Sequence, residues 1–127
     1  MIKAGVLSLF VLLLLVPVFF FSNVNAKAKL NEEQALKVLH TAIEKDNLYG
    51  SRANMSCLTV FTEERGKDYF DFSVHENHGG NCPGNPNASP VTDRFRVDRS
   101  TKRIQWYDPV DDHPVSLKSF LKSRSKR

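Results

Sequence analysis

The strongest constraint on the fold is the alternation of apolar and polar residues in three short segments. Residues 69–75 read Tyr-Phe-Asp-Phe-Ser-Val-His, and residues 94–98 and 104–107 alternate in the same way. Successive side chains of a β-strand point to opposite faces, so each segment predicts a strand with one apolar face. Residues 58–62 consist of β-prone types and predict a further strand. A sheet with one apolar face needs a second layer to cover it.

The sequence also supplies a candidate for that second layer. Residues 32–46 carry apolar side chains at spacings of three and four, which is the period of an amphipathic helix. Asn31 precedes the segment and Gln34 follows three residues later, which is the arrangement of a capping box. The predicted apolar stripe consists of Leu36, Leu39 and Ile43, widened by Ala35, Val38 and Ala42.

These patterns predict an α+β domain in which one N-terminal helix packs on a four-stranded antiparallel meander. One face of the sheet and the helix stripe would form the core. The expected core residues are Leu36, Leu39, Ile43, Leu58, Val60, Phe70, Phe72, Val74, Phe95, Val97, Ile104 and Trp106. The expected opposite face carries Asp71, Ser73, His75, Arg94, Arg96, Asp98, Gln105 and Tyr107.

The N-terminal segment resembles a secretory signal peptide. A lysine near the start is followed by an uncharged, largely apolar run over residues 4–21, and the segment ends in Val24-Asn25-Ala26. Small residues at these positions favour cleavage after Ala26. We therefore expect a secreted or periplasmic protein. The alternative is an uncleaved anchor in the inner membrane formed by residues 4–21, because that run approaches the length of a bilayer span.

The two cysteines agree with export. Cys57 and Cys82 are the only cysteines of the chain, and a lone pair in an oxidising compartment predicts one disulfide bond. By closing the loop between the two cysteines, such a bond would stabilise the fold by roughly 3 kcal/mol in the chain-entropy model. The alternative is a reactive thiol at Cys82, close to His75 or His78.

The basic character of the chain is concentrated at its end. The segment 115–127 holds five Lys and Arg residues and no acidic residue, whereas all 14 acidic residues precede it. We therefore divide the chain into a signal peptide (1–26), an α+β domain (27–114) and a basic C-terminal tail (115–127). The charge of the tail does not indicate a nucleic-acid-binding face. Leu117, Phe120 and Leu121 would share one face if the tail were helical, which suggests weak contact with an anionic membrane.

Several motifs resemble known secreted bacterial proteins. The turn Val97-Asp98-Arg99-Ser100-Thr101-Lys102-Arg103-Ile104, after a helix and strands, resembles PepSY and cystatin-like domains. Lys102 stands where the PepSY turn usually has glycine. Residues 69–72, 81–86, 93–97 and 104–108 are also similar to uncharacterised small secreted bacterial proteins. The resemblance covers residues 31–112 and implies a domain that inhibits or modulates another protein.

Two regions are candidates for contact with a partner. The loop 76–90 is long for a compact domain and contains three prolines, three glycines and Cys82, so we expect it to present Asn85 and Asn87 on a restrained surface. Arg94 and Arg96 share one strand face, and Tyr107 would lie on the next strand. Paired arginines can bind carboxylates, and Arg and Tyr are frequent at protein interfaces.

His75 and His78 admit two interpretations. They could contribute to partner binding beside the loop, or they could bind a metal together with Asp108, Asp111, Asp112 or His113. At a strand end, side chains three residues apart point to opposite faces, and the spacing matches no zinc motif. We therefore expect no metal and no cofactor.

The sequence thus predicts a non-enzymatic binding protein, possible forms of which are an inhibitor or an immunity-type protein acting on another protein. No catalytic motif is present. The alternatives are a small metal-dependent hydrolase that uses His75 and His78, and a membrane-surface protein bound through the basic tail.

Overall fold

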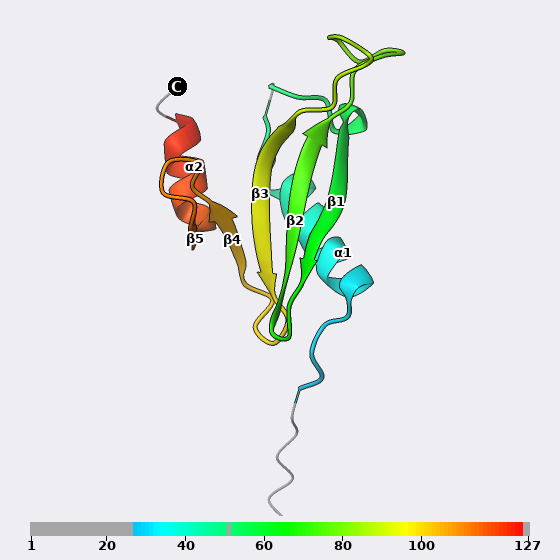
Figure 1. Cartoon of the computed structure of the whole chain (residues 1–127). Helices are drawn as coiled ribbons and strands as arrows, with labels where there is room; N and C mark the ends of the chain where they lie inside the picture. Colours follow the sequence, from blue (N-terminus) through cyan, green and yellow to red (C-terminus); the bar gives the residue numbers. More distant parts are fainter. Residues whose placement is uncertain (1–26, 51, 126–127) are drawn as a thin grey trace, which may run out of the picture.

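A computed structural model describes residues 27–50 and 52–125 of the chain. The predicted signal peptide, residues 1–26, lies outside the described residues. Within these described residues, two helices, a short 3-10 turn and five strands follow one another (Figure 1). Their bounds are α1 Glu32–Lys45, η1 Met55–Cys57, β1 Leu58–Arg65, β2 Tyr69–Glu76, β3 Val91–Asp98, β4 Ile104–Tyr107, β5 Pro114–Ser116 and α2 Leu117–Ser125.

The predicted capping box starts helix α1. The Asn31 side chain accepts a hydrogen bond from the backbone N–H of Gln34 at 2.8 Å. The Gln34 side chain accepts one from the backbone N–H of Asn31 at 3.0 Å. Two N–H groups that would otherwise lack helical partners are satisfied in this way. Glu32 and Glu33 occupy the first turn, where the helix dipole favours negative charge.

The five strands form one antiparallel meander in the order β1-β2-β3-β4-β5. Helix α1 lies behind β1–β3 in Figure 1, so it covers one face of the sheet. The α+β class, the N-terminal helix and the antiparallel meander predicted from the sequence are confirmed. The predicted number of strands was one too low, because β5 has only three residues and begins with Pro114, so it carries no alternation to detect.

The turn between β3 and β4 places a non-glycine residue in a left-handed backbone conformation. Lys102 adopts a φ of 62°, in the left-handed region that favours glycine. The Asp98 carboxylate accepts hydrogen bonds from the backbone N–H groups of Ser100 and Thr101, at 2.9 and 2.7 Å. These bonds lower the pKa of Asp98, chiefly through Thr101. The turn therefore holds its shape through an aspartate cap.

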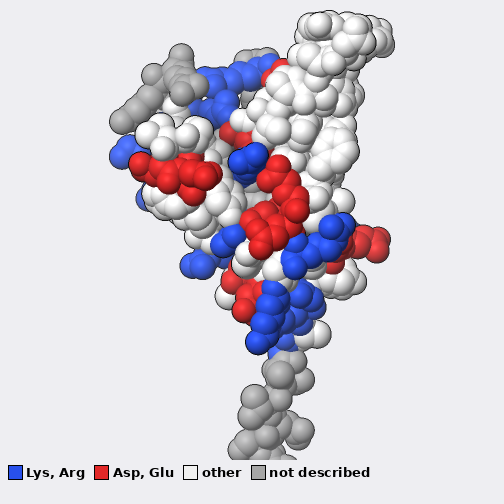
Figure 2. Space-filling view, in the orientation of Figure 1, with Lys and Arg blue, Asp and Glu red and all other residues white. Residues whose placement is uncertain are grey.

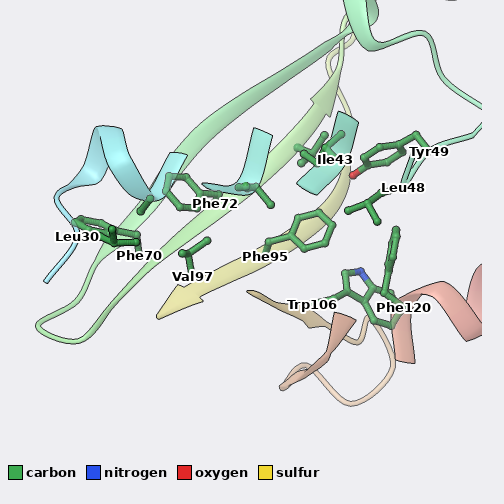
Figure 3. Packing of buried hydrophobic residues seen from close by; sticks show 13 residues of the cluster. Leu30, Ile43, Leu48, Tyr49, Phe70, Phe72, Phe95, Val97, Trp106 and Phe120 are labelled. Carbon is green, nitrogen blue, oxygen red and sulfur yellow. The ribbon is translucent and has the colours of Figure 1, made fainter. Parts of the chain in front are cut away.

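The core lies between the sheet and helix α1 (Figure 3). Phe72, Val74, Phe95 and Val97 are fully buried, as the alternation predicts. The expected core residues that are buried are Leu39, Ile43, Phe70, Phe72, Val74, Phe95, Val97 and Trp106, while Leu36, Leu58, Val60 and Ile104 pack against them half-buried. Leu30, Leu48, Tyr49 and Phe120 complete the core and were not anticipated.

The C-terminal segment is part of the domain up to Ser125. We expected residues 115–127 to form a basic tail, but residues 114–125 form β5 and α2. Phe120 of α2 is fully buried, with its ring centroid 5.3 Å from that of Trp106 and 5.5 Å from that of Phe95. The residue that would have centred a membrane-binding face therefore packs in the core.

A buried polar network fixes α2 against the sheet. The carboxylate of Asp93 accepts a hydrogen bond from Trp106 Nε1 at 2.9 Å and one from Arg124 Nη2 at 2.6 Å. The Asp93 side chain is 3% exposed, so both partners compensate for its burial. Burial raises the pKa of Asp93, and the Arg124 charge opposes that shift.

In the part of the chain that the structure describes, neither helix is long and apolar enough to cross a membrane.

Candidate functional site

The predicted disulfide bond between Cys57 and Cys82 is present, with the two Cα atoms 5.6 Å apart. Cys57 lies in η1, immediately before β1, and Cys82 lies in the loop between β2 and β3. The bond therefore ties this loop to the start of the first strand. The backbone N–H of Asn77 also donates to the carbonyl oxygen of Cys57 at 2.7 Å, so the beginning of the loop is held at the same place.

Hydrogen bonds within the loop restrict it further. Gly79 and Cys82 exchange backbone N–H···O bonds of 3.0 and 2.9 Å around a tight turn. Gly79 has a φ of 118°, which only glycine adopts easily. A second turn follows, in which the Asn85 side chain accepts from the N–H of Asn87 at 3.0 Å. The loop is thus built of two turns and a covalent crosslink.

We call the end of the sheet formed by loop 77–90 together with Phe61, His75 and Val91 the apex. Residues 77–92 contain no Lys, Arg, Asp or Glu, although a quarter of the whole chain is charged. Figure 2 shows this end as a surface without charged side chains, whereas both signs of charge crowd the middle of the same view. Residues 83–91 are all exposed. The apex is therefore a prominent, uncharged surface.

Two large apolar side chains are exposed at the apex. Phe61 of β1 is 50% exposed and Val91 of β3 is 44% exposed. The His75 ring lies edge-on to Phe61, with the ring centroids 4.9 Å apart. His75 is opposite Val91 in the β2–β3 pairing. The expected loop residues Asn85 and Asn87 are exposed beyond them.

His75 is held in one orientation by two oxygen atoms. Its Nδ1 lies 3.0 Å from the carbonyl oxygen of Ser89, which can only accept, so Nδ1 carries the proton. Nε2 lies 3.1 Å from the hydroxyl oxygen of Ser73, within hydrogen-bond distance. The pair resembles a nucleophile and base, but Ser73 is 1% exposed, so its hydroxyl faces no substrate. The contact of His75 Nδ1 with the Ser89 carbonyl oxygen connects β2 to the loop.

His78 has a structural environment. Its Nε2 lies 3.2 Å from a carboxylate oxygen of Glu76, and its Nδ1 is buried without a hydrogen-bond partner. Gly84 packs on the ring so closely that a Cβ at this position would lie 2.6 Å from His78 Cγ. The imidazole therefore supports the second turn of the loop rather than pointing into solvent.

The residues considered for a metal site do not assemble into one. In residues 27–50 and 52–125, no group of three or more His, Cys, Asp and Glu side chains is placed to hold an ion. The cavity beside the disulfide measures about 230 Å³ and is lined by His78, Glu76 and Asn54, among others. That volume is below the usual size of a small-molecule pocket, which is roughly 300 Å³ or more.

Two of the other predicted binding residues, Arg96 and Tyr107, belong to a self-contained polar network on the outer face. Asp71 of β2 accepts two hydrogen bonds from the Arg96 guanidinium, each 2.8 Å long, and one from the Tyr107 hydroxyl at 2.9 Å. The guanidinium also stacks 3.5 Å above the centroid of the Tyr69 ring. Asp71 itself is 6% exposed. Arg96 and Tyr107 therefore stabilise a buried carboxylate, which differs from the open pair that the sequence suggested.

Arg94 is the more accessible of the two arginines. Its side chain is 50% exposed, and its Nε lies 3.2 Å from a carboxylate oxygen of Glu63 on β1. A half-exposed ion pair of this kind contributes little stability and exchanges partners easily. Of the predicted outer-face residues, Arg94 is therefore the one that a partner could reach at the border of the apex.

Two features of the site escaped the sequence analysis. The sequence analysis places Phe61 in a β-prone segment without assigning it to a face. Its neighbour Val60 is an expected core residue, and because successive side chains of a strand alternate, Phe61 had to lie on the outer face. The central role of Asp71 depends on side chains from β3 and β4, and the sequence alone does not reveal that register.

Comparisons with known proteins add no guide: no protein-family model matches the chain, and no curated protein or solved structure matches it.

The Asp71 network predicts unequal roles for the two arginines. Arg96→Ala leaves a buried carboxylate without its cation, which costs about 3 kcal/mol of the free energy of unfolding. Arg94→Ala removes a half-exposed pair and costs less than about 1 kcal/mol. Urea unfolding of the two variants measures both losses. Equal losses would contradict the structural role of Arg96.

The tyrosines predict a specific alkaline behaviour. Burial raises the pKa of Tyr49, and burial together with the bond to Asp71 raises the pKa of Tyr107 to about 12. A hydrogen bond to Glu64 raises the pKa of Tyr69. These are the three tyrosines of the chain. The folded protein thus keeps phenolic protons that the unfolded chain releases near pH 10, so its stability falls as the pH rises from about 10 towards 12.

Phenolate ultraviolet absorbance measures this difference. The native protein should titrate above the midpoint of about 10 that is expected in urea. Tyr107→Phe should reduce the alkaline loss of stability while leaving neutral stability less affected than Arg96→Ala does. Coinciding native and unfolded titration curves would show that the tyrosines lack these partners.

Proposed function

We propose that this protein is a non-enzymatic binding domain, exported to the periplasm or beyond, that binds another protein through the apex. An inhibitor and an immunity-type protein are the concrete forms of such a function. The single observation that carries the proposal is the uncharged, exposed and crosslinked apex, which presents Phe61 and Val91 beside loop 77–90.

The composition of the apex supports a protein partner. The cores of protein interfaces are depleted of charged residues and contain aromatic side chains, while charges lie at the rim. The apex has the same arrangement: Phe61 lies in an uncharged region, and Arg94 with Glu63 stands at its border. The exposed loop also offers asparagine side chains, which can both donate and accept hydrogen bonds.

The restraint of the loop supports a presented surface. Ordering a loop during binding costs free energy, and a loop that is already ordered avoids that cost. The disulfide bond, the Gly79–Cys82 turn and the contact of His75 with Ser89 each hold the loop before any partner arrives. A chain segment that merely connected β2 and β3 would not need these devices.

Export is supported by the disulfide bond and by the N-terminal segment. Disulfides persist in oxidising compartments and are rare in the cytosol. The resemblance to PepSY and cystatin-like domains agrees with a modulator of another protein and stays a prediction. The N-terminal segment fits a cleaved signal peptide, with an inner-membrane anchor as the alternative.

The test is capture of the partner with matched variants. Val91→Asp places a charge in the apex and should weaken binding at least about tenfold, which corresponds to about 1.4 kcal/mol. Val91 is 44% exposed, so the variant should unfold almost as the parent does. The protein, exported by its own leader, is immobilised and exposed to extracytoplasmic extract. Retained proteins are identified, and their affinities are then measured in purified form.

The control is Leu121→Asp. Leu121 is 42% exposed, close to the exposure of Val91, and lies on helix α2 rather than in the apex. This variant should retain every partner that the parent retains. The proposal is wrong if Val91→Asp binds each partner as tightly as the parent, or if both variants lose binding equally.

A further inference from the structure

The two borders of the sheet differ in how they are protected. A strand at the border of a sheet presents backbone groups that can pair with another chain, and proteins usually block such strands with short length, proline, charges or bulges. The β5 border has three residues and starts with Pro114. The β1 border is eight residues long, and among the described strands β1 pairs with β2 alone.

The second half of β1 is blocked. The register of the β1–β2 pairing shifts between Thr62 and Glu64, and the strand ends in Glu63, Glu64 and Arg65. Helix α1 reaches this end of the strand. Both guanidinium bonds of Arg65 go to Glu32, at 2.6 and 2.8 Å. Figure 1 shows the beginning of α1 beside the lower end of β1.

The first half of β1 lacks charge, proline and a register shift, although helix α1 reaches its last residue: the Thr62 hydroxyl donates a hydrogen bond to Glu32 at 2.7 Å. Residues 58–62 read Leu-Thr-Val-Phe-Thr, with no charge, proline or glycine. All five residues are at least partly exposed, and Phe61 is 50% exposed. A segment with these properties is a template for strand pairing.

We propose that two copies of this chain form a dimer in which the Leu58–Thr62 segments of β1 pair antiparallel. The two sheets then join into one continuous sheet with a two-fold axis beside Val60. Each copy presents the same patch, as a closed two-fold interface requires. The dimer is argued from the border of β1 and not from the partner proposed for the apex; the two surfaces share Phe61, whereas Val91 and loop 77–90 lie outside the strand pairing.

The charge pattern selects a second copy in this orientation. When Val60 of the two copies are opposite, Leu58 faces Thr62 and Thr59 faces Phe61. Each uncharged segment thus meets only its own counterpart. Glu63 of each copy falls opposite Cys57, where the strand begins, so no like charges meet. A parallel arrangement would align Glu63 and Glu64 of the two copies and is disfavoured.

The side chains of the outer face support the same register. Thr59 and Phe61 lie on one face of the sheet, because they are two residues apart. Phe61 of each copy therefore covers the Thr59 methyl group of the other, and the two phenyl rings lie diagonally across the axis. Aromatic and β-branched residues are favourable in cross-strand pairs. A half-exposed Phe61 becomes buried in this way.

Sedimentation equilibrium of the exported, purified protein tests the proposal. Between about 10 μM and about 1 mM, a range suited to a weak interface, we expect a reversible monomer–dimer equilibrium. Phe61→Lys adds a charge to the unprotected border and should raise the dimer dissociation constant at least about tenfold. Val91→Lys adds the same charge to the same outer face, with similar exposure, but on the inner strand β3. It should leave the dissociation constant unchanged.

Three results would overturn the proposal: a monomer at every concentration, a dimer insensitive to Phe61→Lys, or an equal loss of association in both variants. Should Phe61→Lys fail to fold, hydrogen exchange of the parent protein tests whether the dimer forms. The amides of residues 58–62 should exchange more slowly as the concentration rises, whereas those of residues 114–116 should not. Concentration-independent exchange at residues 58–62 would equally overturn the dimer.

Discussion

The disulfide bond between Cys57 and Cys82 is the constraint on which the arrangement of the apex depends. It joins loop 77–90, which contains neither helix nor strand, to the residue immediately before β1. Backbone hydrogen bonds at Gly79, Cys82 and Asn77 surround the crosslink, so covalent and non-covalent restraints act on the same segment. A small domain has a limited core to stabilise such a loop, and a crosslink compensates for that limit.

The two faces of the sheet have different structural roles. The inner face packs on α1, and Phe120 and the Asp93–Arg124 pair draw α2 into the same core. Neither of the two helices in the described part of the chain covers the outer face, yet this face is ordered by Asp71, which binds Arg96 and Tyr107. Because these charges satisfy one another, the uncharged apex and the first half of β1 remain as the distinctive surfaces.

Much of the fold could be predicted from local patterns. The capping box at Asn31, the alternation in β2 and the two cysteines each specified a feature that the structure contains. The alternation also assigned Phe72 and Phe95 to the core, because period and face are properties of a single strand. Strand β5 escaped prediction, since its few residues have no period to detect.

The sites were harder to predict because they depend on register and on distant parts of the chain. Arg94 and Arg96 look equivalent in sequence, but only Arg96 lies opposite Asp71 across the β2–β3 pairing. The sequence assigns Arg124 to a basic tail, whereas in the structure its guanidinium donates a hydrogen bond to the buried carboxylate of Asp93. In both cases an ordinary charged residue gains its role from a carboxylate that folding brings beside it.

Amide hydrogen exchange of the loop before and after reduction of the disulfide tests the central claim most directly. In the oxidised protein, the hydrogen-bonded amides of Gly79, Cys82 and Ala88 should exchange slowly. After reduction they should exchange rapidly, while the amides of β2 and β3 stay protected and the free energy of unfolding falls by about 3 kcal/mol. Rapid exchange of the loop amides in the oxidised protein, or exchange that reduction leaves unchanged, would contradict the account.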